Sequence, residues 1–127
     1  MDNPCFKIMK KELKLVEKFH RKFRTPVLEK PSLISRDRAE FRFKLMKEEV
    51  EEYLRGVEND NLENIAKELA DILYAVYGTV LEHGLQDKME EIFLENHRSQ
   101  MSKERHQYKM IKGEKFKEAN ITKIIKS

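Results

Sequence analysis

Four glutamates stand within the segment KEEVEEYLRG, residues 47–56, and carboxylates at this density can hold a cation or activate water. At about 100° per residue, a helix here places Glu49 near the edge of its apolar stripe. Glu52 and then Glu48 lie further round the same side. Glu51 projects to the other side, where it would be an ordinary solvated charge. Three of the four carboxylates can therefore converge on one site.

A second acidic pair, Glu68 and Asp71, lies three residues apart on one flank of the next apolar stripe. Two helices joined by a short turn near residue 60 would pack antiparallel and bring both acidic edges to one groove. Carboxylates gathered there repel and raise one another's pKa unless a cation lies among them. All-oxygen ligands without Cys or His favour Mg²⁺ or Mn²⁺ over zinc. The alternative is a solvated face, which a chain with 23 acids readily provides.

Two helices are expected before a break at residues 59–61. Asn3 and Pro4 suit the start of the first helix, whose apolar residues keep helical spacing to about residue 23. Two prolines in RTPVLEKPSLIS then keep the connection out of helix. Ser35 can cap the second helix. The side of that helix that we expect to be buried carries Phe43, Met46, Val50, Tyr53, Leu54 and Val57.

Two further helices and a tail follow. Asp60 and Glu63 have the capping-box spacing for a third helix, which is expected to stop at Gly84. Asp87 and Glu90 repeat the capping signal for a fourth helix. The lysine-rich remainder has weak periodicity, so we expect irregular structure with a short helix or strand.

The chain is therefore expected to be all-α, a four-helix-type bundle with a short irregular basic C-terminal tail. Its length indicates a single domain, residues 1–127, with a helical body over 1–101 and the tail over 102–127. The tail holds eight Lys or Arg against three acids, while the body is slightly acidic. Because only 39% of the residues are hydrophobic and another 39% are charged, a partner subunit could be needed to complete the core.

Composition also indicates a compartment. Cys5 is the only cysteine, so no internal disulfide can form. No apolar run approaches the length of a signal peptide's hydrophobic region or of a membrane span. We therefore expect a soluble, reduced, cytoplasmic protein with no membrane partner.

The motifs also carry a resemblance to a known group of enzymes. LMKEEVEEYLRG followed by ELADILYAVYGTVLEHGL resembles the paired EExxE and ExxD motifs of the MazG-like all-α nucleoside triphosphate pyrophosphohydrolases. ENHRSQMSK is similar to the HxSNMSK segment of the phosphoribosyl-ATP pyrophosphohydrolase-like branch, and VEKFHRKFRTPVLEKP resembles the opening of that branch. The likeness extends from about Val16 to Lys117, and its motifs are specific when taken together.

This resemblance implies a helical bundle that assembles as a homodimer or larger homo-oligomer and binds a nucleotide with Mg²⁺, for which Mn²⁺ can substitute. It implies hydrolysis between the α and β phosphates to a nucleoside monophosphate and pyrophosphate, in housecleaning of the nucleotide pool. The implied metal ligands are Glu49, Glu52, Glu68 and Asp71. Glu48 is the implied base for the attacking water, because a carboxylate that holds no ion accepts a proton more readily.

The implied substrate- and phosphate-binding residues are Arg42, His97, Arg98, Ser99, Lys103 and Lys117. Each has an ordinary alternative, such as a surface salt bridge for Arg42, a core position for His97 and a solvated charge for a lysine. Gln100 stands where the branch usually has Asn, which leaves the course of the tail and the base and sugar contacts open. His20 is undecided between a structural and a nucleotide-facing role.

Two other functions stay open at this point. A nucleotide-binding or regulatory protein could keep the pocket without turnover, although all five acidic positions are filled. A nucleic-acid-binding module would use the basic tail, but the aromatic residues there are only Tyr108 and Phe116, so nucleic acid is the less favoured partner. No motif distinguishes a canonical or damaged dNTP, dUTP or phosphoribosyl-ATP as substrate.

Overall fold

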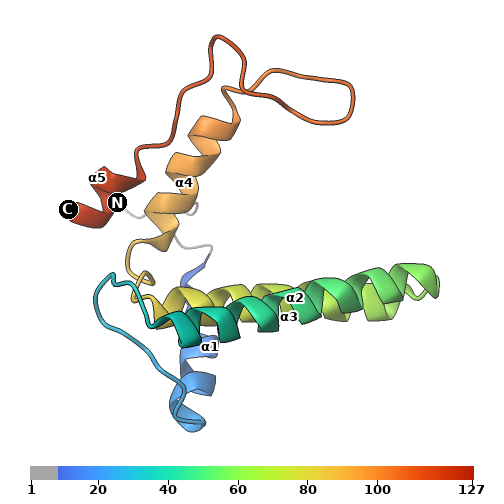
Figure 1. The fold of residues 1–127 in the computed structure, drawn as a ribbon, viewed down its shortest axis with the longest axis vertical. Helices are drawn as coiled ribbons and strands as arrows, with labels where there is room; N and C mark the ends of the chain where they lie inside the picture. Colours follow the sequence, from blue (N-terminus) through green and yellow to red (C-terminus); the bar gives the residue numbers. More distant parts are fainter. Residues whose placement is uncertain (1–8) are drawn as a thin grey trace. The chain divides into compact units, whose positions relative to one another are not determined.

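The computed structural model describes residues 9–127, and over this range the chain is all-α (Figure 1). The helices are α1 (Lys10–Lys22), α2 (Arg36–Glu58), α3 (Leu62–Glu82), α4 (Met89–Gln100) and α5 (Ile121–Lys126). The described residues contain no strand, and their β structure is an isolated antiparallel bridge between Glu104 and Ile111. The predicted all-α class is confirmed.

The helices belong to two compact units. One unit, residues 10–86, contains α1, α2 and α3, and the other, residues 87–127 together with Met9, contains α4 and α5. The boundary expected from the charge pattern, between residues 101 and 102, falls inside the second unit. The assignment of the whole chain to a single domain stays a prediction.

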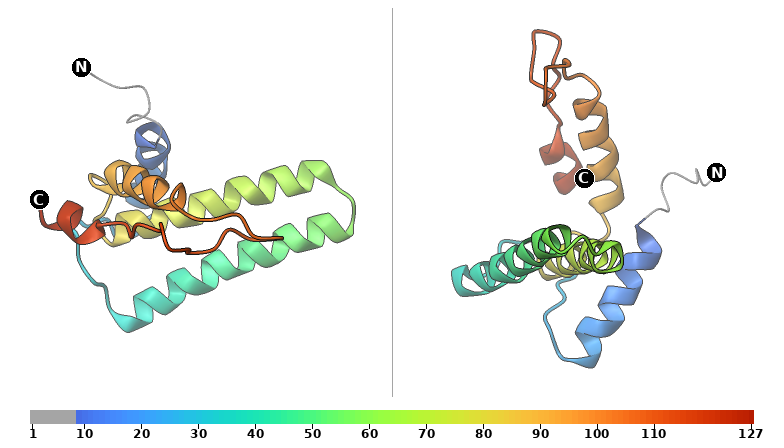
Figure 2. Two further views of the ribbon diagram at one scale, coloured as in Figure 1. Left: turned by 90° about the horizontal axis from the view of Figure 1, so that it is seen from above. Right: turned by 90° about the vertical axis from the view of Figure 1, so that its right-hand side faces the viewer.

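The first unit is built on a helical hairpin. α2 and α3 run antiparallel and lie side by side, joined by the turn at residues 59–61 (Figure 2). α3 also packs against α1. α3 is therefore the central helix of this unit, and its residues meet α1 as well as α2.

Several helix ends follow the local sequence. The Ser35 side chain accepts a hydrogen bond from the Arg38 amide at 3.2 Å, which confirms it as the cap of α2. α3 ends at Glu82, and Gly84 follows with a φ of +65°, where a Cβ atom would overlap the Lys30 carbonyl oxygen. The expected stop at Gly84 is thus confirmed, and its physical basis is both the left-handed backbone and the close approach of the chain.

Other expected caps are wrong. Asn61, rather than Asp60, caps α3 by accepting from the Asn64 amide at 3.1 Å. Asp60 instead has a φ of +51° and belongs to the turn, a conformation that Asp tolerates. α4 begins after Lys88 without a side-chain cap, so the Asp87 signal has no structural counterpart. The predicted start of the first helix at Asn3 and Pro4 lies outside the described residues.

The expected short helix in the tail is confirmed as α5. Asn120 caps it by accepting from the Lys123 amide, and its own amide donates to Glu95 Oε2 of α4 at 2.6 Å. At the other end, Lys88 Nζ donates to the Ser127 carbonyl at 3.0 Å. The tail therefore returns to α4 and forms the second unit with it.

The apolar core of the first unit lies mainly between α1 and α3. It includes Leu13, Val16, Val80 and Leu81, all of which are buried. The rings of Phe19 and Tyr74 meet edge to face with centroids 5.4 Å apart. α2 adds mainly polar contacts, because its buried residues are Arg42 and Gly56.

The prediction of a buried apolar side on α2 is wrong for the single chain. Phe43 is 58% exposed and Leu54 is 54% exposed, and Val50 and Val57 are also exposed. α3 similarly carries an exposed apolar stripe of Leu62, Leu69, Leu73 and Val76. Apolar periodicity identifies one face of a helix, but it does not show whether other residues of the same chain cover that face. We call these two sets of residues the exposed apolar stripes.

Candidate functional site

Three carboxylates from the two hairpin helices converge. Glu49 of α2 and Glu68 and Asp71 of α3 each offer one oxygen, and these atoms lie within 4.8 Å of one another. Glu68 is buried, and the Oε2 atoms of Glu49 and Glu68 have no hydrogen-bond partner within the described part of the chain. Unpaired buried carboxylate oxygens are rare because their desolvation is costly. These three residues, the acidic cluster below, therefore have the donor atoms that a metal ion requires.

The electrostatics of the acidic cluster also favour a bound cation. Burial raises the pKa of Glu49 to about 7, with further contributions from the neighbouring carboxyl groups of Glu68, Glu52 and Asp71. Burial, followed by the proximity of the Glu52 carboxyl group, also raises the pKa of Glu68. The nearby cation is Lys67, whose Nζ is 2.7 Å from Asp71 Oδ2 but which is itself exposed. A divalent cation would relieve the mutual repulsion far better than this single ammonium group.

The remaining glutamates of the EExxE segment differ in environment. Glu52 lies outside the set of mutually close oxygens and has an ion pair of 3.8 Å with Arg55. Glu48 is exposed, and its side chain has no hydrogen bond or ion pair within residues 9–127. Glu51 is exposed beside Lys47 at 3.9 Å, as expected for a solvated charge. The roles of Glu52 as a ligand and of Glu48 as a base stay predictions.

A pocket of about 220 Å³ adjoins the acidic cluster. Glu49 and Asp71 belong to its wall, so the space opens directly beside the carboxylates. Its other lining residues are Phe19, His20, Arg42, Leu45, Tyr74 and Ala75. The pocket thus combines acidic, basic and aromatic groups, and all three helices of the unit contribute to it.

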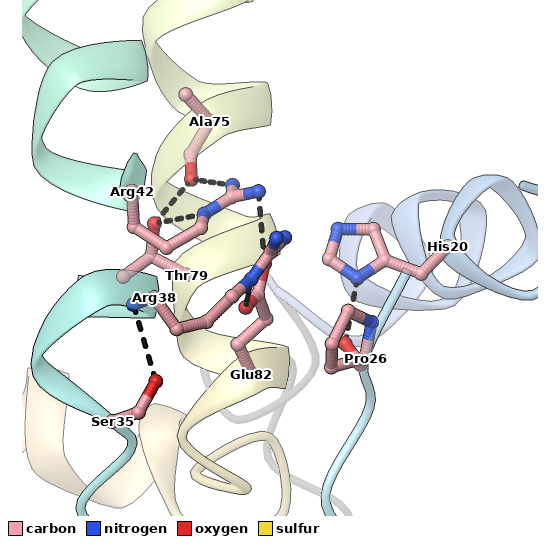
Figure 3. Close-up of polar contacts among 8 residues, drawn as sticks. All are labelled: His20, Pro26, Ser35, Arg38, Arg42, Ala75, Thr79 and Glu82. Carbon is pink, nitrogen blue, oxygen red and sulfur yellow. Dashed lines mark hydrogen bonds and ion pairs between the residues drawn. The ribbon is translucent and has the colours of Figure 1, made fainter. Parts of the chain in front are cut away.

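Arg42 is held firmly at this pocket (Figure 3). Its Nε donates to Thr79 Oγ1 at 3.1 Å, its Nη2 donates to the Ala75 carbonyl at 2.9 Å, and its Nη1 lies 3.0 Å from Glu82 Oε2. Burial lowers the pKa of Arg42, and the charge of Glu82 opposes that effect. The alternative of a surface salt bridge is wrong, because the residue is only 5% exposed. Phosphate binding by Arg42 stays a prediction.

Two further buried residues lie near Arg42: His20, whose role the sequence left open, and Glu82, which the sequence analysis missed. His20 is buried on α1, and its Nδ1 must carry a proton because it lies 3.0 Å from the Pro26 carbonyl, which can only accept (Figure 3). Glu82 is fully buried on α3 and pairs with Arg38 and Arg42. The available signal was an acid inside the apolar run of α3, opposite two arginines spaced four residues apart on α2.

The predicted residues of the HxSNMSK-like segment lie in the α4–α5 unit. Arg98 donates to both carboxylate oxygens of Glu95 and to the Glu118 carbonyl at 3.1 Å. Ser99 is buried, whereas His97 is exposed, so a core position for His97 is wrong. Arg98 and Lys117 line an open pocket of about 660 Å³ in this unit, together with Met101, Ser102, Glu114, Lys115 and Phe116. Lys103 is half-buried.

Comparison with known families decides the class of the chain. The model of the phosphoribosyl-ATP pyrophosphohydrolase family matches residues 16–100, more than half of the 127 residues. The chain belongs to this family. The match covers the acidic cluster, the pocket and α4, and it confirms the resemblance drawn from the motifs. A search of curated proteins gave no match.

Membership in the phosphoribosyl-ATP pyrophosphohydrolase family supports a pyrophosphohydrolase in general. The family is generally metal-dependent, and the acidic cluster could hold the metal. Within the described residues, no helix combines the length and the apolar character that a membrane crossing requires.

Proposed function

We propose that this family member is a Mg²⁺-dependent hydrolase that cleaves a nucleotide between its α and β phosphates and releases a nucleoside monophosphate and pyrophosphate. Such an activity would suit the removal of unwanted nucleotides from the cellular pool. The observation that carries the proposal is the convergence of Glu49, Glu68 and Asp71, two of which have buried oxygens without a partner. Family membership supplies the reaction class.

The donor set of the acidic cluster fits a hard divalent cation. Its ligands are carboxylate oxygens without Cys or His, which suits Mg²⁺, with Mn²⁺ as a substitute. Glu49, Glu68 and Asp71 would hold the ion, with Glu52, three residues from Glu49 on α2, as a fourth ligand. When bound, such an ion supplies positive charge that offsets the charge of the phosphate oxygens and polarises the phosphoryl group.

Glu48 is the proposed general base. It directly precedes a ligand, and its carboxylate is exposed and free of cationic partners within residues 9–127. A carboxylate in that state keeps the electron density needed to accept a proton. Glu48 would orient a water molecule and take its proton as the water oxygen bonds to the α phosphorus. The bridging oxygen then leaves with pyrophosphate.

Basic residues would bind the phosphates. Arg42 lines the pocket beside the acidic cluster, and a guanidinium group can donate to two phosphate oxygens at once. From the α4–α5 unit, the proposed further substrate contacts are His97, Arg98, Ser99, Lys103 and Lys117. Their cationic groups would offset phosphate charge, and the Ser99 hydroxyl group would donate a hydrogen bond.

We also propose that a second copy of the chain covers the exposed apolar stripes. Leu62 is 76% exposed, and the buried apolar core of the described residues is small for a chain of this length. The stripes repeat along α2 and α3 at helical spacing, which suits packing against helices of another subunit. A homodimer or larger homo-oligomer would complete the core that one chain leaves open.

A substrate panel tests the proposed reaction. The purified protein would be incubated with dNTPs, NTPs and phosphoribosyl-ATP in Mg²⁺ or Mn²⁺, and pyrophosphate and monophosphate would be measured. We expect equal amounts of the two products from at least one nucleotide, and no turnover after chelation of the metal. Release of inorganic phosphate alone would contradict cleavage between the α and β phosphates.

A further inference from the structure

The most completely buried charge in the hairpin is the carboxylate of Glu82, near the end of α3 (Figure 3). Arg38 donates to it from Nε at 2.6 Å and from Nη2 at 2.9 Å, and Arg42 Nη1 approaches it at 3.0 Å. Glu82 and Arg42 are buried and Arg38 is partly exposed, and a buried ion pair gives little net stability compared with apolar residues of the same size. The geometry of this network indicates a second role.

The network fixes one of its arginines at the pocket. Arg42 is bonded through all three of its nitrogens, to Thr79, to the Ala75 carbonyl and to Glu82. A guanidinium group has five N–H groups, so these bonds leave one on Nη1 and one on Nη2. Arg42 lines the pocket beside the acidic cluster, whereas Arg38 does not. The same carboxylate thus holds one arginine that faces the pocket and one that does not.

Gly78 provides the room for this arrangement. A Cβ atom at this position would lie 2.5 Å from Arg42 Nη2 and 2.8 Å from His20 Nε2. The end of the guanidinium group therefore lies against the backbone of α3, with the imidazole of α1 beside it. Any side chain at residue 78 would displace one of them.

We propose that Glu82 is a positioning residue, which holds Arg42 so that its two remaining N–H groups meet phosphate oxygens of a nucleotide at the acidic cluster. This inference rests on the proposed function through the phosphate contact of Arg42. Because the guanidinium group is already held in place, it loses little conformational freedom when it binds an anion.

The test compares three variants by titration with magnesium pyrophosphate, the proposed product, and by kcat and KM for an active nucleotide. Glu82→Gln and Arg42→Lys should each weaken pyrophosphate binding and raise KM by about tenfold, the range expected for loss of one charge-assisted hydrogen bond. Arg38→Met is the matched control, since it breaks a pair with the same carboxylate without touching a residue of the pocket. It should change pyrophosphate binding less than about twofold, whatever its effect on Tm.

A double variant separates positioning from general damage. Glu82→Gln combined with Arg42→Lys should bind pyrophosphate about as weakly as Arg42→Lys alone, because Glu82 acts only by holding the Arg42 guanidinium group, which Arg42→Lys already removes. If Glu82→Gln does not fold, Thr79→Val removes another anchor of the same guanidinium group and should weaken binding in the same direction. Additive losses in the double variant, or an equal loss in Arg38→Met, would overturn the inference. A wild-type protein that binds pyrophosphate but releases none from any nucleotide would instead contradict the proposed function.

Discussion

Replacement of Glu49 by Gln should stabilise the metal-free protein at alkaline pH. In the unfolded chain the carboxyl group has an ordinary pKa near 4.5, whereas burial beside Glu68, Glu52 and Asp71 raises the pKa in the folded protein to about 7. Below pH 4.5 the group is protonated in both states. As pH rises to about 7, only the unfolded state releases its proton, so the free energy of unfolding falls, and above that pH the full penalty remains.

The size of this penalty follows from the pKa difference. A rise from 4.5 to about 7 corresponds to roughly 3 kcal/mol, since each pKa unit is worth about 1.4 kcal/mol. Glu49 keeps some access to water, and its neighbours share the repulsion, so we expect the substitution to recover about 1–2 kcal/mol at pH 8. The recovery should nearly vanish at pH 4.5, where the wild-type carboxyl group is already protonated in the folded state.

Urea unfolding in the presence of EDTA at pH 8 and pH 4.5 would measure the effect. Glu51→Gln is the matched control, because Glu51 belongs to the same helix but is exposed beside Lys47, and we expect a change of no more than about 0.5 kcal/mol. Addition of Mg²⁺ should raise the Tm of the wild type and of the control but not that of Glu49→Gln. A Glu49→Gln variant that is less stable than the wild type at pH 8, or as responsive to Mg²⁺, would refute the reasoning about this cluster.

Three further predictions concern other parts of the chain. Glu48→Gln should lower kcat by at least about 100-fold in the pyrophosphate-release assay and keep Mg²⁺-dependent nucleotide binding; unchanged turnover would remove Glu48 from the mechanism. Hydrogen bonds from Arg98 and from the Asn120 amide lower the pKa of Glu95 to about 2. The link between α4 and α5 should therefore be intact above pH 4.5 and be lost as the pH falls towards 2. Amide exchange in α5 would follow this loss, and Glu95→Gln should abolish its pH dependence. Leu54→Glu should shift the mass measured by light scattering towards the monomer, and an unchanged mass would exclude Leu54 from the interface.

Signals that act over a few residues predicted local structure well. Ser35 and Gly84 mark helix ends because a side-chain oxygen and a left-handed backbone act within one turn. Asp60 and Asn61 show the limit, since both can cap a helix and the turn geometry decides between them. The apolar spacing of α2 is present, but most of these side chains are exposed in the single chain. The sequence could not show this, because periodicity carries no information about what packs against a helix face.

The same distinction applies to the site. Glu49, Glu68 and Asp71 could be grouped from the sequence because helical spacing and one short turn determine which edges of α2 and α3 meet. Glu82 and His20 could not, since their environments depend on contacts between helices that are distant in sequence.

The acidic cluster and the Arg42 guanidinium group lie along one side of the hairpin because of the residue spacing on α2 and α3. Arg42 and Glu49 are seven residues apart on α2, two turns along one side, and Asp71 and Thr79 are eight apart on the facing side of α3. Antiparallel pairing therefore aligns a carboxylate end with a guanidinium end. A cation at the carboxylate end and a phosphate at the guanidinium end would each meet its complementary charge along the wall of one pocket. The buried carboxylate of Glu82 then explains how α2 can carry a fixed arginine inside the unit without leaving its charge uncompensated.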